Sequence, residues 1–319
     1  MYFPEKRVTN NEFAKTMDTS DEWIRERTGI AERRFSAEGE ATSDMSAKAA
    51  MDCLDRAGVS PDEVDAIVVC TVTPDMFFPS TACLVQRKIG ASNAWGFDLS
   101  AACSGFVFGL STGAQFIESG RYKKVLVIGC DTMTSIVDFS DRATCVLFGD
   151  GAGAVLLEPS KDGEAGIIDF EMHCDGTGEE FLYMPAGGSL NPPSHETVDK
   201  KMHYVQQDGR TVFKFAVKYM TEVSEQLLKK NQIPIEDMRL VIPHQANLRI
   251  INSISDRLKL TEEQLGLNIE KYANTTAATI PTCLCEYHRA GKLKPGDLIM
   301  ASSFGAGFTW GSVLFRWGI

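Results

Sequence analysis

Apolar residues recur along the chain in two patterns: short continuous runs, and longer stretches in which every third or fourth position is apolar. Between a capping sequence at 42–44 and Gly58, apolar positions fall on one face, which predicts a helix. A turn with proline and acidic residues follows at 60–65. Residues 66–70 are then continuously apolar, as is typical of a buried strand. The segment predicts a helix–turn–strand unit of an α/β protein.

The second half repeats this order about 170 residues later. A helical apolar face covers 213–227, a second proline–acidic turn follows at 233–239, and residues 240–242 are apolar. Further strands are predicted at 125–129 and 298–302, each of them after a turn that contains glycine and lysine. The two halves are therefore expected to share one topology.

The repeat predicts a duplicated α/β chain with domains 1–165 and 166–319 and a site between the two halves. Each half contains a segment of small residues that leads into a helix, at 100–105 and at 273–278. The stretch 185–193 is rich in glycine and proline and predicts a surface loop.

Composition narrows the class of protein. The chain has 319 residues, 43 of them acidic and 32 basic, so its formal net charge is −11 at pH 7. This balance argues against general nucleic-acid binding, which needs a basic face. No apolar run approaches the ~20 residues of a membrane helix, and the first ten residues lack a signal-peptide core. We expect a cytoplasmic protein that binds neither membranes nor nucleic acid.

The nine cysteines form no C-x-x-C pair, which disfavours a zinc ribbon and indicates reduced thiols. We expect eight of them to be packing residues and Cys103 to be the exception. Cys103 lies between a predicted strand at 95–99 and a helix that begins near Gly105. The positive end of a helix dipole favours a thiolate and lowers its pKa, which is the setting of a covalent nucleophile.

Two polar residues of the second half are candidates to act with this thiol. His244 follows the strand at 240–242, and the C-terminal ends of strands are where α/β sites collect. Asn274 is a candidate helix cap and also a neutral amide donor. A neutral amide beside a neutral imidazole could bind a developing oxyanion.

Two glycine-rich stretches, 148–153 and 304–307, lack the spacing of a dinucleotide-binding loop and of a P-loop. A nucleotide cofactor bound in this way is not expected. The second stretch can bring a backbone N–H close to a ligand, because glycine neighbours permit a close approach.

Seven motifs run in order along nearly the whole chain: DTSDEWI (18–24), RTGI (27–30), AACSGF (101–106), FGDGAGA (148–154), PHQANLRI (243–250), NTTAA (274–278) and FGAGFTWG (304–311). In these motifs the chain resembles the β-ketoacyl-acyl-carrier-protein synthase III family of the thiolase-like superfamily. The resemblance implies a thiolase-like α/β fold whose duplicated halves form α-β-α-β-α layers. It also implies a catalytic triad of Cys103, His244 and Asn274, with backbone N–H groups of Cys103 and Ala306 as the oxyanion hole.

The activity implied by the resemblance is the initiating condensation of type II fatty acid synthesis. An acyl-CoA primer would acylate Cys103, and malonyl-acyl-carrier protein would then lose CO2 and condense with the acyl group. No metal or organic cofactor is expected. The resemblance places CoA at Trp23, Arg27, Arg142, Gly209 and Asn247.

Further residues carried over from the family concern the acyl pocket and the carrier protein. The acyl pocket is expected at Phe213 and Phe78, with Phe78 crossing the interface of a homodimer. An acidic carrier protein needs a basic surface, expected at Arg249, Lys214 and Arg257, with Lys218 and Lys259 as further candidates. Lys214 and Lys218 are also explained as one solvated helix face. Asp256 departs from the basic residue often found at its position in the family.

A further departure is at the front of the chain. The family normally begins with a short strand before a Tyr-x-Pro sequence, which is Tyr2-Phe3-Pro4 here. One core strand is therefore expected to be missing from the sequence as given, and a misassigned start is the simplest account. If the protein itself lacks the strand, it is expected to be less stable.

Several alternatives share part of this chemistry. A related acyltransferase or a polyketide starter enzyme could use Cys103 without malonyl condensation. A thiolase would need a second catalytic cysteine near 304–308, where none occurs. A hydroxymethylglutaryl-CoA synthase would need a glutamate base for which no comparable motif is present. An inactive partner subunit is disfavoured by the presence of all three triad residues.

Overall fold

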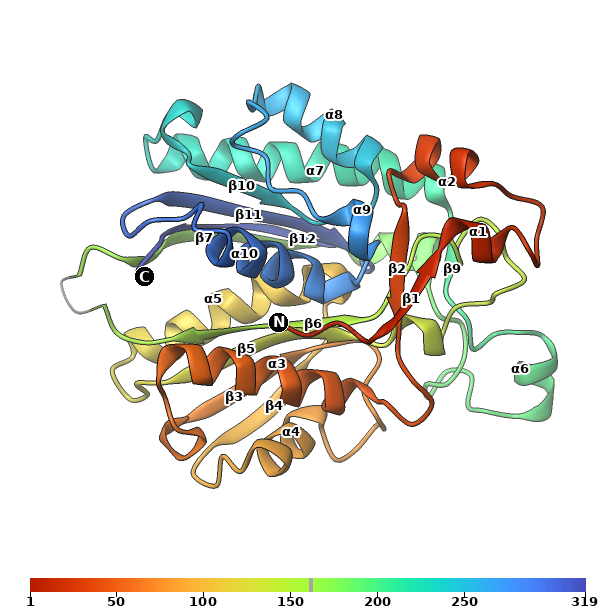
Figure 1. The fold of residues 1–319 in the computed structure, drawn as a ribbon, viewed down its shortest axis with the longest axis horizontal. Helices are drawn as coiled ribbons and strands as arrows, with labels where there is room; N and C mark the ends of the chain where they lie inside the picture. The colour runs from red at the N-terminus through yellow and green to blue at the C-terminus, as the bar shows by residue number, and fades with distance from the viewer. Residues whose placement is uncertain (161–162) are drawn as a thin grey trace.

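The computed structural model describes residues 1–160 and 163–319, which form two four-stranded sheets in a stack of five α-β-α-β-α layers (Figure 1). In spatial order, the first sheet consists of β4 (Trp95–Leu99), β3 (Ala66–Cys70), β5 (Val125–Asp131) and β6 (Gly151–Leu157). The second consists of β10 (Leu240–Pro243), β11 (Leu298–Gly305), β12 (Thr309–Arg316) and β7 (Gly166–Cys174).

Three strands of each sheet share one pairing pattern. In the first, β3 pairs in parallel with β5, and β5 pairs antiparallel with β6. In the second, β10 pairs in parallel with β11, and β11 pairs antiparallel with β12. The predicted turns with proline and acidic residues are 3-10 turns that precede β3 and β10. The repeat read from the sequence is therefore present in the strand topology.

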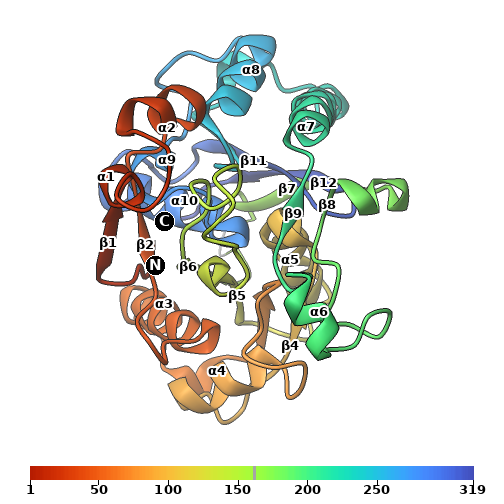
Figure 2. The ribbon, with the colours of Figure 1, turned by 90° about the vertical axis from the view of Figure 1, so that its right-hand side faces the viewer.

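Helices form the outer and central layers, as the second view shows (Figure 2). The first sheet is covered by α3 (Thr42–Ala57) and α4 (Thr81–Ile89), and the second by α7 (Gly209–Lys230) and α8 (Leu248–Leu258). Between the sheets lie α5 (Gly105–Glu118) and α10 (Thr279–Arg289). The smaller elements are β1 (Lys6–Thr9), α1 (Asn10–Phe13), α2 (Asp21–Thr28), β2 (Glu32–Phe35), β8 (Leu182–Tyr183), α6 (His195–Asp199), β9 (Gln206–Gln207) and α9 (Ile269–Tyr272).

Close packing of α5 against the first sheet depends on a stripe of glycines. A side chain at Gly109 would overlap the sulfur of Cys70, and one at Gly113 would lie 2.9 Å from Leu157 and from Val127. Because real Cβ atoms do not approach that closely, larger residues at Gly109 or Gly113 would push the helix off the strands. The glycines thus fix the height of α5, and of the turn before it, above the sheet.

The antiparallel pair of β1 and β2, which are separated in the chain by α1 and α2, packs beside both halves (Figure 1). Its Arg33 is fully buried and donates hydrogen bonds to Asn10 Oδ1 at 2.7 Å and to the carbonyl of Val146 at 2.8 Å. Before β1, Tyr2 forms an antiparallel bridge with Ala152 of β6. Among the helices described, none combines the length and apolar character of a transmembrane span.

The cysteines differ in part from expectation. Within the described ranges all nine are free, and Cys70, Cys130, Cys145 and Cys283 are buried as predicted. The packing prediction is wrong for Cys83 and Cys174, which are exposed. Cys83 lies on α4, whose core-facing residues are others, and Cys174 ends strand β7. Cys53 and Cys285 are half-buried.

Candidate active site

The candidate nucleophile lies on a single strained turn between β4 and α5. Cys103 is the central residue of the 3-10 turn Ala102–Ser104, and Ala102 before it has a left-handed backbone with φ of 46°. Non-glycine residues adopt that region at a cost, so the turn is held by its surroundings. The hydroxyl of Ser303 donates to the Cys103 carbonyl at 2.8 Å, and Ser104 donates to the Thr309 carbonyl at 3.0 Å. Strands β11 and β12 of the second half thereby hold the nucleophile of the first.

Gly305, at the end of β11, makes this contact possible. A Cβ atom at residue 305 would lie 2.9 Å from the Cys103 nitrogen, 3.0 Å from the Ser104 nitrogen and 3.1 Å from the Ala101 carbonyl oxygen. All three neighbours are backbone atoms, which cannot move aside as a flexible side chain can. The absence of a side chain therefore lets the 304–307 loop, which includes Ala306, lie against the nucleophile turn.

His244 follows β10 and is only 3% exposed. Its backbone N–H donates to the Ser302 carbonyl at 2.8 Å, and its ring Nδ1 lies 2.7 Å from the hydroxyl oxygen of Thr279. The other ring nitrogen, Nε2, is buried and has no hydrogen-bond partner among the described residues. Burial lowers the pKa of His244 to about 3, so the imidazole is neutral at pH 7.

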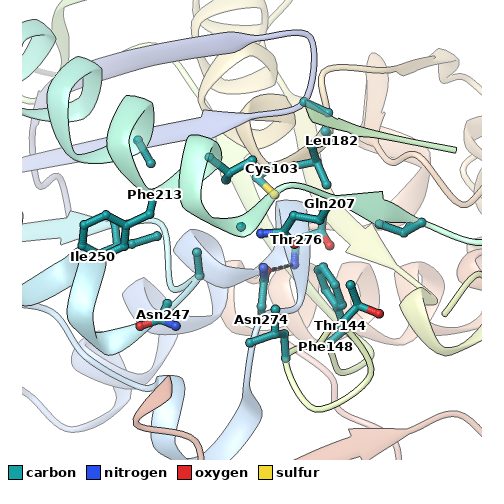
Figure 3. A pocket seen from close by; sticks show the side chains of 18 of the residues that line it. Cys103, Thr144, Phe148, Leu182, Gln207, Phe213, Asn247, Ile250, Asn274 and Thr276 are labelled. Atoms are coloured by element: carbon teal, nitrogen blue, oxygen red, sulfur yellow. Dashed lines mark hydrogen bonds between the residues drawn. The ribbon is translucent and has the colours of Figure 1, made fainter. Parts of the chain in front are cut away.

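Asn274 is 6% exposed and is anchored at both its backbone and its side chain. Its N–H donates to the Leu147 carbonyl at 2.9 Å, and its carbonyl accepts from Gly149 at 3.1 Å. The side-chain Oδ1 accepts from the N–H of Thr276 at 2.9 Å (dashed in Figure 3). The N-cap of the 3-10 turn Thr276–Ala278 is Thr275, so Asn274 orders the residues before this turn and is not the cap that was expected. The bond to Oδ1 leaves the amide hydrogens of Nδ2 to face a ligand.

These side chains meet in one cavity of about 530 Å³. Cys103, His244, Asn274 and Ala306 all line it, although they come from four separate segments of the chain. Figure 3 shows the Cys103 sulfur pointing to the part of the cavity that also holds Gln207, Thr276 and Asn274. The wall is predominantly apolar with a few convergent polar groups, which is the usual character of a small-molecule site.

The sequence predicted a lowered pKa for the Cys103 thiol, and this prediction is wrong. Burial, and to a smaller extent the nearby buried carboxylate of Asp131, raise the pKa of Cys103 to about 12. The expected lowering by a helix end does not prevail, because the thiol is 8% exposed and no cation faces it among the described residues. In the free protein, the thiol and the imidazole are both neutral.

The residues expected to bind CoA lie at the cavity mouth, with one exception. Trp23, Arg27, Gly209 and Asn247 line the cavity. Arg142 is not part of its wall, but its guanidinium carbon lies 4.9 Å from the Trp23 ring centroid, and that of Arg27 lies 4.5 Å from it. Two cations thus already cover the indole ring.

Asn247 has a structural task that the sequence did not reveal. Its Oδ1 accepts from the N–H of Arg249 at 2.9 Å and caps α8, while its Nδ2 donates to the Arg27 carbonyl at 3.0 Å. The amide of Asn247 therefore ties α8 to α2, and it meets a ligand in the channel only with the hydrogen-bonding capacity that remains.

The two expected acyl-pocket residues are in different surroundings. Phe213 lines the cavity beside Ile250 (Figure 3). Phe78 is 85% exposed and does not line the cavity of its own chain, and Phe77 beside it is 78% exposed. A pocket role for Phe78 would therefore require a second chain.

The expected carrier-docking cations lie on the outer helices α7 and α8. Arg249 is exposed and lines the cavity mouth, and Lys214 and Arg257 are exposed. In the described part of the chain, none of these three forms an ion pair with a carboxylate, whereas Lys200, Lys201 and Lys230 do. Their charge is therefore available to an acidic partner.

Residues that sequence reasoning did not single out hold the site in place. The carboxylate of Asp131 accepts from the Ala277 N–H at 3.2 Å and from the hydroxyls of Thr71 and Thr73 at 2.9 Å, which joins the two halves. Glycines of the 148–153 stretch allow a similar approach, since a Cβ at Gly153 would lie 2.8 Å from Pro281 of α10. No group of three metal-ligating side chains occurs within residues 1–160 and 163–319.

Comparison with known proteins agrees with this geometry. Residues 97–176 match the family model for 3-oxoacyl-[acyl-carrier-protein] synthase III, and residues 228–317 match the model for its C-terminal part. The chain is 56% identical to the β-ketoacyl-[acyl-carrier-protein] synthase III of Koribacter versatilis, over 99% of this chain and 95% of that protein. It is 55% identical to the enzyme of the same name from Solibacter usitatus, over 99% and 96%.

Solved structures extend the comparison to the fold. The crystal structure of 3-oxoacyl-[acyl-carrier-protein] synthase III from Aquifex aeolicus superimposes with a TM-score of 0.92 at 45% identity, over 99% of this chain and 97% of that one. The expected thiolase-like α/β fold is therefore confirmed. The chain belongs to the 3-oxoacyl-[acyl-carrier-protein] synthase III family of condensing acyltransferases.

Proposed function

We propose that this chain condenses an acyl-CoA primer with malonyl-acyl-carrier protein through an acyl-enzyme on Cys103, as the first condensation of type II fatty acid synthesis. The proposal is supported by the family and by one observation above all. A thiol, a neutral imidazole and an amide with an anchored oxygen face a single, largely apolar cavity.

In the first half-reaction, the Cys103 sulfur attacks the thioester carbonyl of the primer. Backbone N–H groups of Cys103 and Ala306 stabilise the oxyanion, the carbon–sulfur bond to CoA breaks, and the thiol proton leaves with the CoA sulfur. The raised pKa of the buried Cys103 thiol favours proton removal that accompanies attack over proton removal that precedes it.

In the second half-reaction, the malonyl thioester oxygen accepts hydrogen bonds from His244 and Asn274. Loss of CO2 leaves an enolate whose charge these two donors stabilise. The enolate carbon attacks the acyl carbonyl, the bond to the Cys103 sulfur breaks, and one proton from solvent restores the thiol. A protonated imidazole is not required, which agrees with the lowered pKa of His244. The scheme uses only the chain's own groups, so we propose that no metal or organic cofactor takes part.

The test separates acyl transfer from condensation. Incubation with a panel of acyl-CoAs should give one acyl adduct by intact mass, which Cys103→Ser removes. Cys83→Ser is the matched control, because Cys83 is the more exposed thiol and should not carry the adduct. Malonyl-acyl-carrier protein should then release CO2 and yield a 3-ketoacyl product. An adduct without CO2 release would indicate an acyltransferase that does not condense.

We also propose a homodimer in which Phe78 closes the acyl pocket of the partner, working in the cytoplasm, where thiols stay reduced. Support comes from the exposure of Phe77 and Phe78, since large apolar side chains rarely face solvent in adjacent pairs. Sedimentation of the wild type and of Phe78→Ala tests the dimer. If the wild type sediments as a monomer and Phe78→Ala still alters its primer preference, Phe78 does not act across a dimer interface and the proposal is wrong.

A further inference from the structure

The two ring nitrogens of His244 have unequal surroundings. Nδ1 is 2.7 Å from the Thr279 hydroxyl oxygen, whereas Nε2 is buried without a partner in the described part of the chain, and the side chain lines the cavity. A neutral imidazole carries one proton, so one nitrogen is a donor and the other an acceptor. Which nitrogen carries the proton decides whether His244 can donate to a substrate oxygen.

The Thr279 hydroxyl has one proton and two possible acceptors. It can donate to the Thr276 carbonyl, 3.2 Å away, and then accept a bond from a protonated Nδ1. It can instead donate to Nδ1, in which case the imidazole proton is on Nε2. The direction of this one hydroxyl therefore selects the tautomer of His244.

The neighbouring Asn274 favours the second arrangement. Its oxygen is occupied by the Thr276 N–H, so it can offer only amide hydrogens to the cavity. A thioester oxygen bound by Asn274 and His244 together needs a second donor, which requires the proton on Nε2. The shorter of the two Thr279 distances is also the one to Nδ1.

We propose that Thr279 is a positioning residue that donates its hydroxyl hydrogen bond to Nδ1 of His244 and so holds the imidazole as the Nε2–H tautomer. The inference rests on the proposed function, because the donor is needed for malonyl decarboxylation and not for acylation of Cys103. The effect of Thr279 on the substrate is exerted only through His244.

The backbone around Thr276 makes this arrangement rigid. Thr276 has a left-handed φ of 53°, which a β-branched residue adopts only under constraint. Its N–H orients Asn274, its carbonyl lies against the Thr279 hydroxyl, and the next N–H, of Ala277, is bound by Asp131. One turn therefore positions both donors of the condensation step.

The test compares Thr279→Val, which keeps the shape and removes the hydroxyl, with Thr279→Ser, which keeps the hydroxyl. The matched control is Thr282→Val on the same helix, since Thr282 is buried and donates to the Ala278 carbonyl at 2.7 Å. Two rates are measured: acyl transfer from acyl-CoA to Cys103, and CO2 release from malonyl-acyl-carrier protein.

Thr279→Val should slow CO2 release about tenfold, as expected for one lost hydrogen bond to a buried group, and change acyl transfer less than about twofold. Thr279→Ser should restore CO2 release, and Thr282→Val should leave both rates close to wild type. An equal fall in both rates, or no fall, would overturn the inference. A wild type that neither acylates nor releases CO2 would instead overturn the proposed function.

Nitrogen-15 NMR of histidine-labelled wild type provides a readout that does not depend on any variant. A proton bonded to Nε2 of His244 is expected, assigned by its loss in His244→Asn. A proton on Nδ1 would refute the proposal even if Thr279→Val failed to fold.

Discussion

The contact between Gly305 and the nucleophile turn can be tested with a single methyl group. In Gly305→Ala the new Cβ would lie 2.9 Å from the Cys103 nitrogen. An ordinary contact begins near 3.4 Å, so β11 and the turn have to separate by about 0.5 Å. All three of the nearest atoms belong to the backbone, which leaves no flexible side chain to absorb the change.

Overpacking of this kind lowers the free energy of unfolding by about 1–3 kcal/mol. The larger effect is expected on catalysis, because the displaced groups include the backbone N–H of Cys103 and the loop that carries Ala306. Misplacing one oxyanion donor reduces kcat by roughly 10²–10³. CoA release under single-turnover conditions measures this step, and denaturant unfolding measures stability.

Gly188→Ala is the matched control, because a Cβ at residue 188 meets nothing within 4 Å and the backbone there is not left-handed. It should leave rate and stability unchanged. If Gly305→Ala acylates Cys103 at the wild-type rate, the close approach of β11 does not position the oxyanion hole, and the reasoning is refuted.

Three further predictions concern ionisable side chains. Arg249→Glu should raise the KM for malonyl-acyl-carrier protein about tenfold but not that for malonyl-CoA, whereas Lys294→Glu, with the same charge change on a distant exposed turn, should alter neither. Burial lowers the pKa of His244 from 6.5 to about 3. Between these pH values the unfolded chain binds a proton at His244 that the folded chain does not bind. The free energy of unfolding therefore falls as the pH drops from 6.5 towards 3. His244→Asn should make that fall shallower by up to about 1.4 kcal/mol per pH unit in denaturant titrations, and an unchanged slope would contradict the assignment. Arg33→Lys should cost about 1–3 kcal/mol in the same assay, because a lysine cannot keep all three of the hydrogen bonds that the Arg33 guanidinium makes. An unchanged midpoint would count against that role.

Much of the fold could be predicted because its central strands, such as β3 and β5, are buried along their whole length, while β4 at the sheet edge is half-buried. The runs 66–70 and 95–99 coincide with β3 and β4, and the helix that ends at Gly58 is α3. Strand ends were less well predicted: β5 continues to Asp131, two residues beyond the apolar run. A polar residue can extend a strand when its side chain is bonded elsewhere, and nothing local in the sequence shows that.

The candidate site also has features that the sequence could predict and features that it could not. Cys103, His244 and Asn274 could be singled out because each follows a strand or begins a helical turn in a recognisable motif. The raised pKa of Cys103 could not be predicted, since it depends on how much chain covers the thiol. Nor could the bond from Ala277 to Asp131, whose partners are 146 residues apart in the sequence.

The two strained turns, one in each half of the chain, have the same backbone geometry. Ala102 and Thr276 both adopt left-handed φ values, of 46° and 53°, each opens a 3-10 turn that leads into a central helix, and the two turns are in contact. Counted along these turns, the counterpart of Cys103 is Ala277, which is almost completely buried. The two halves thus provide two equivalent turn positions, and only the first carries a thiol. The second carries a methyl group, and its backbone N–H is bound by Asp131, so this turn supports the one that carries the nucleophile.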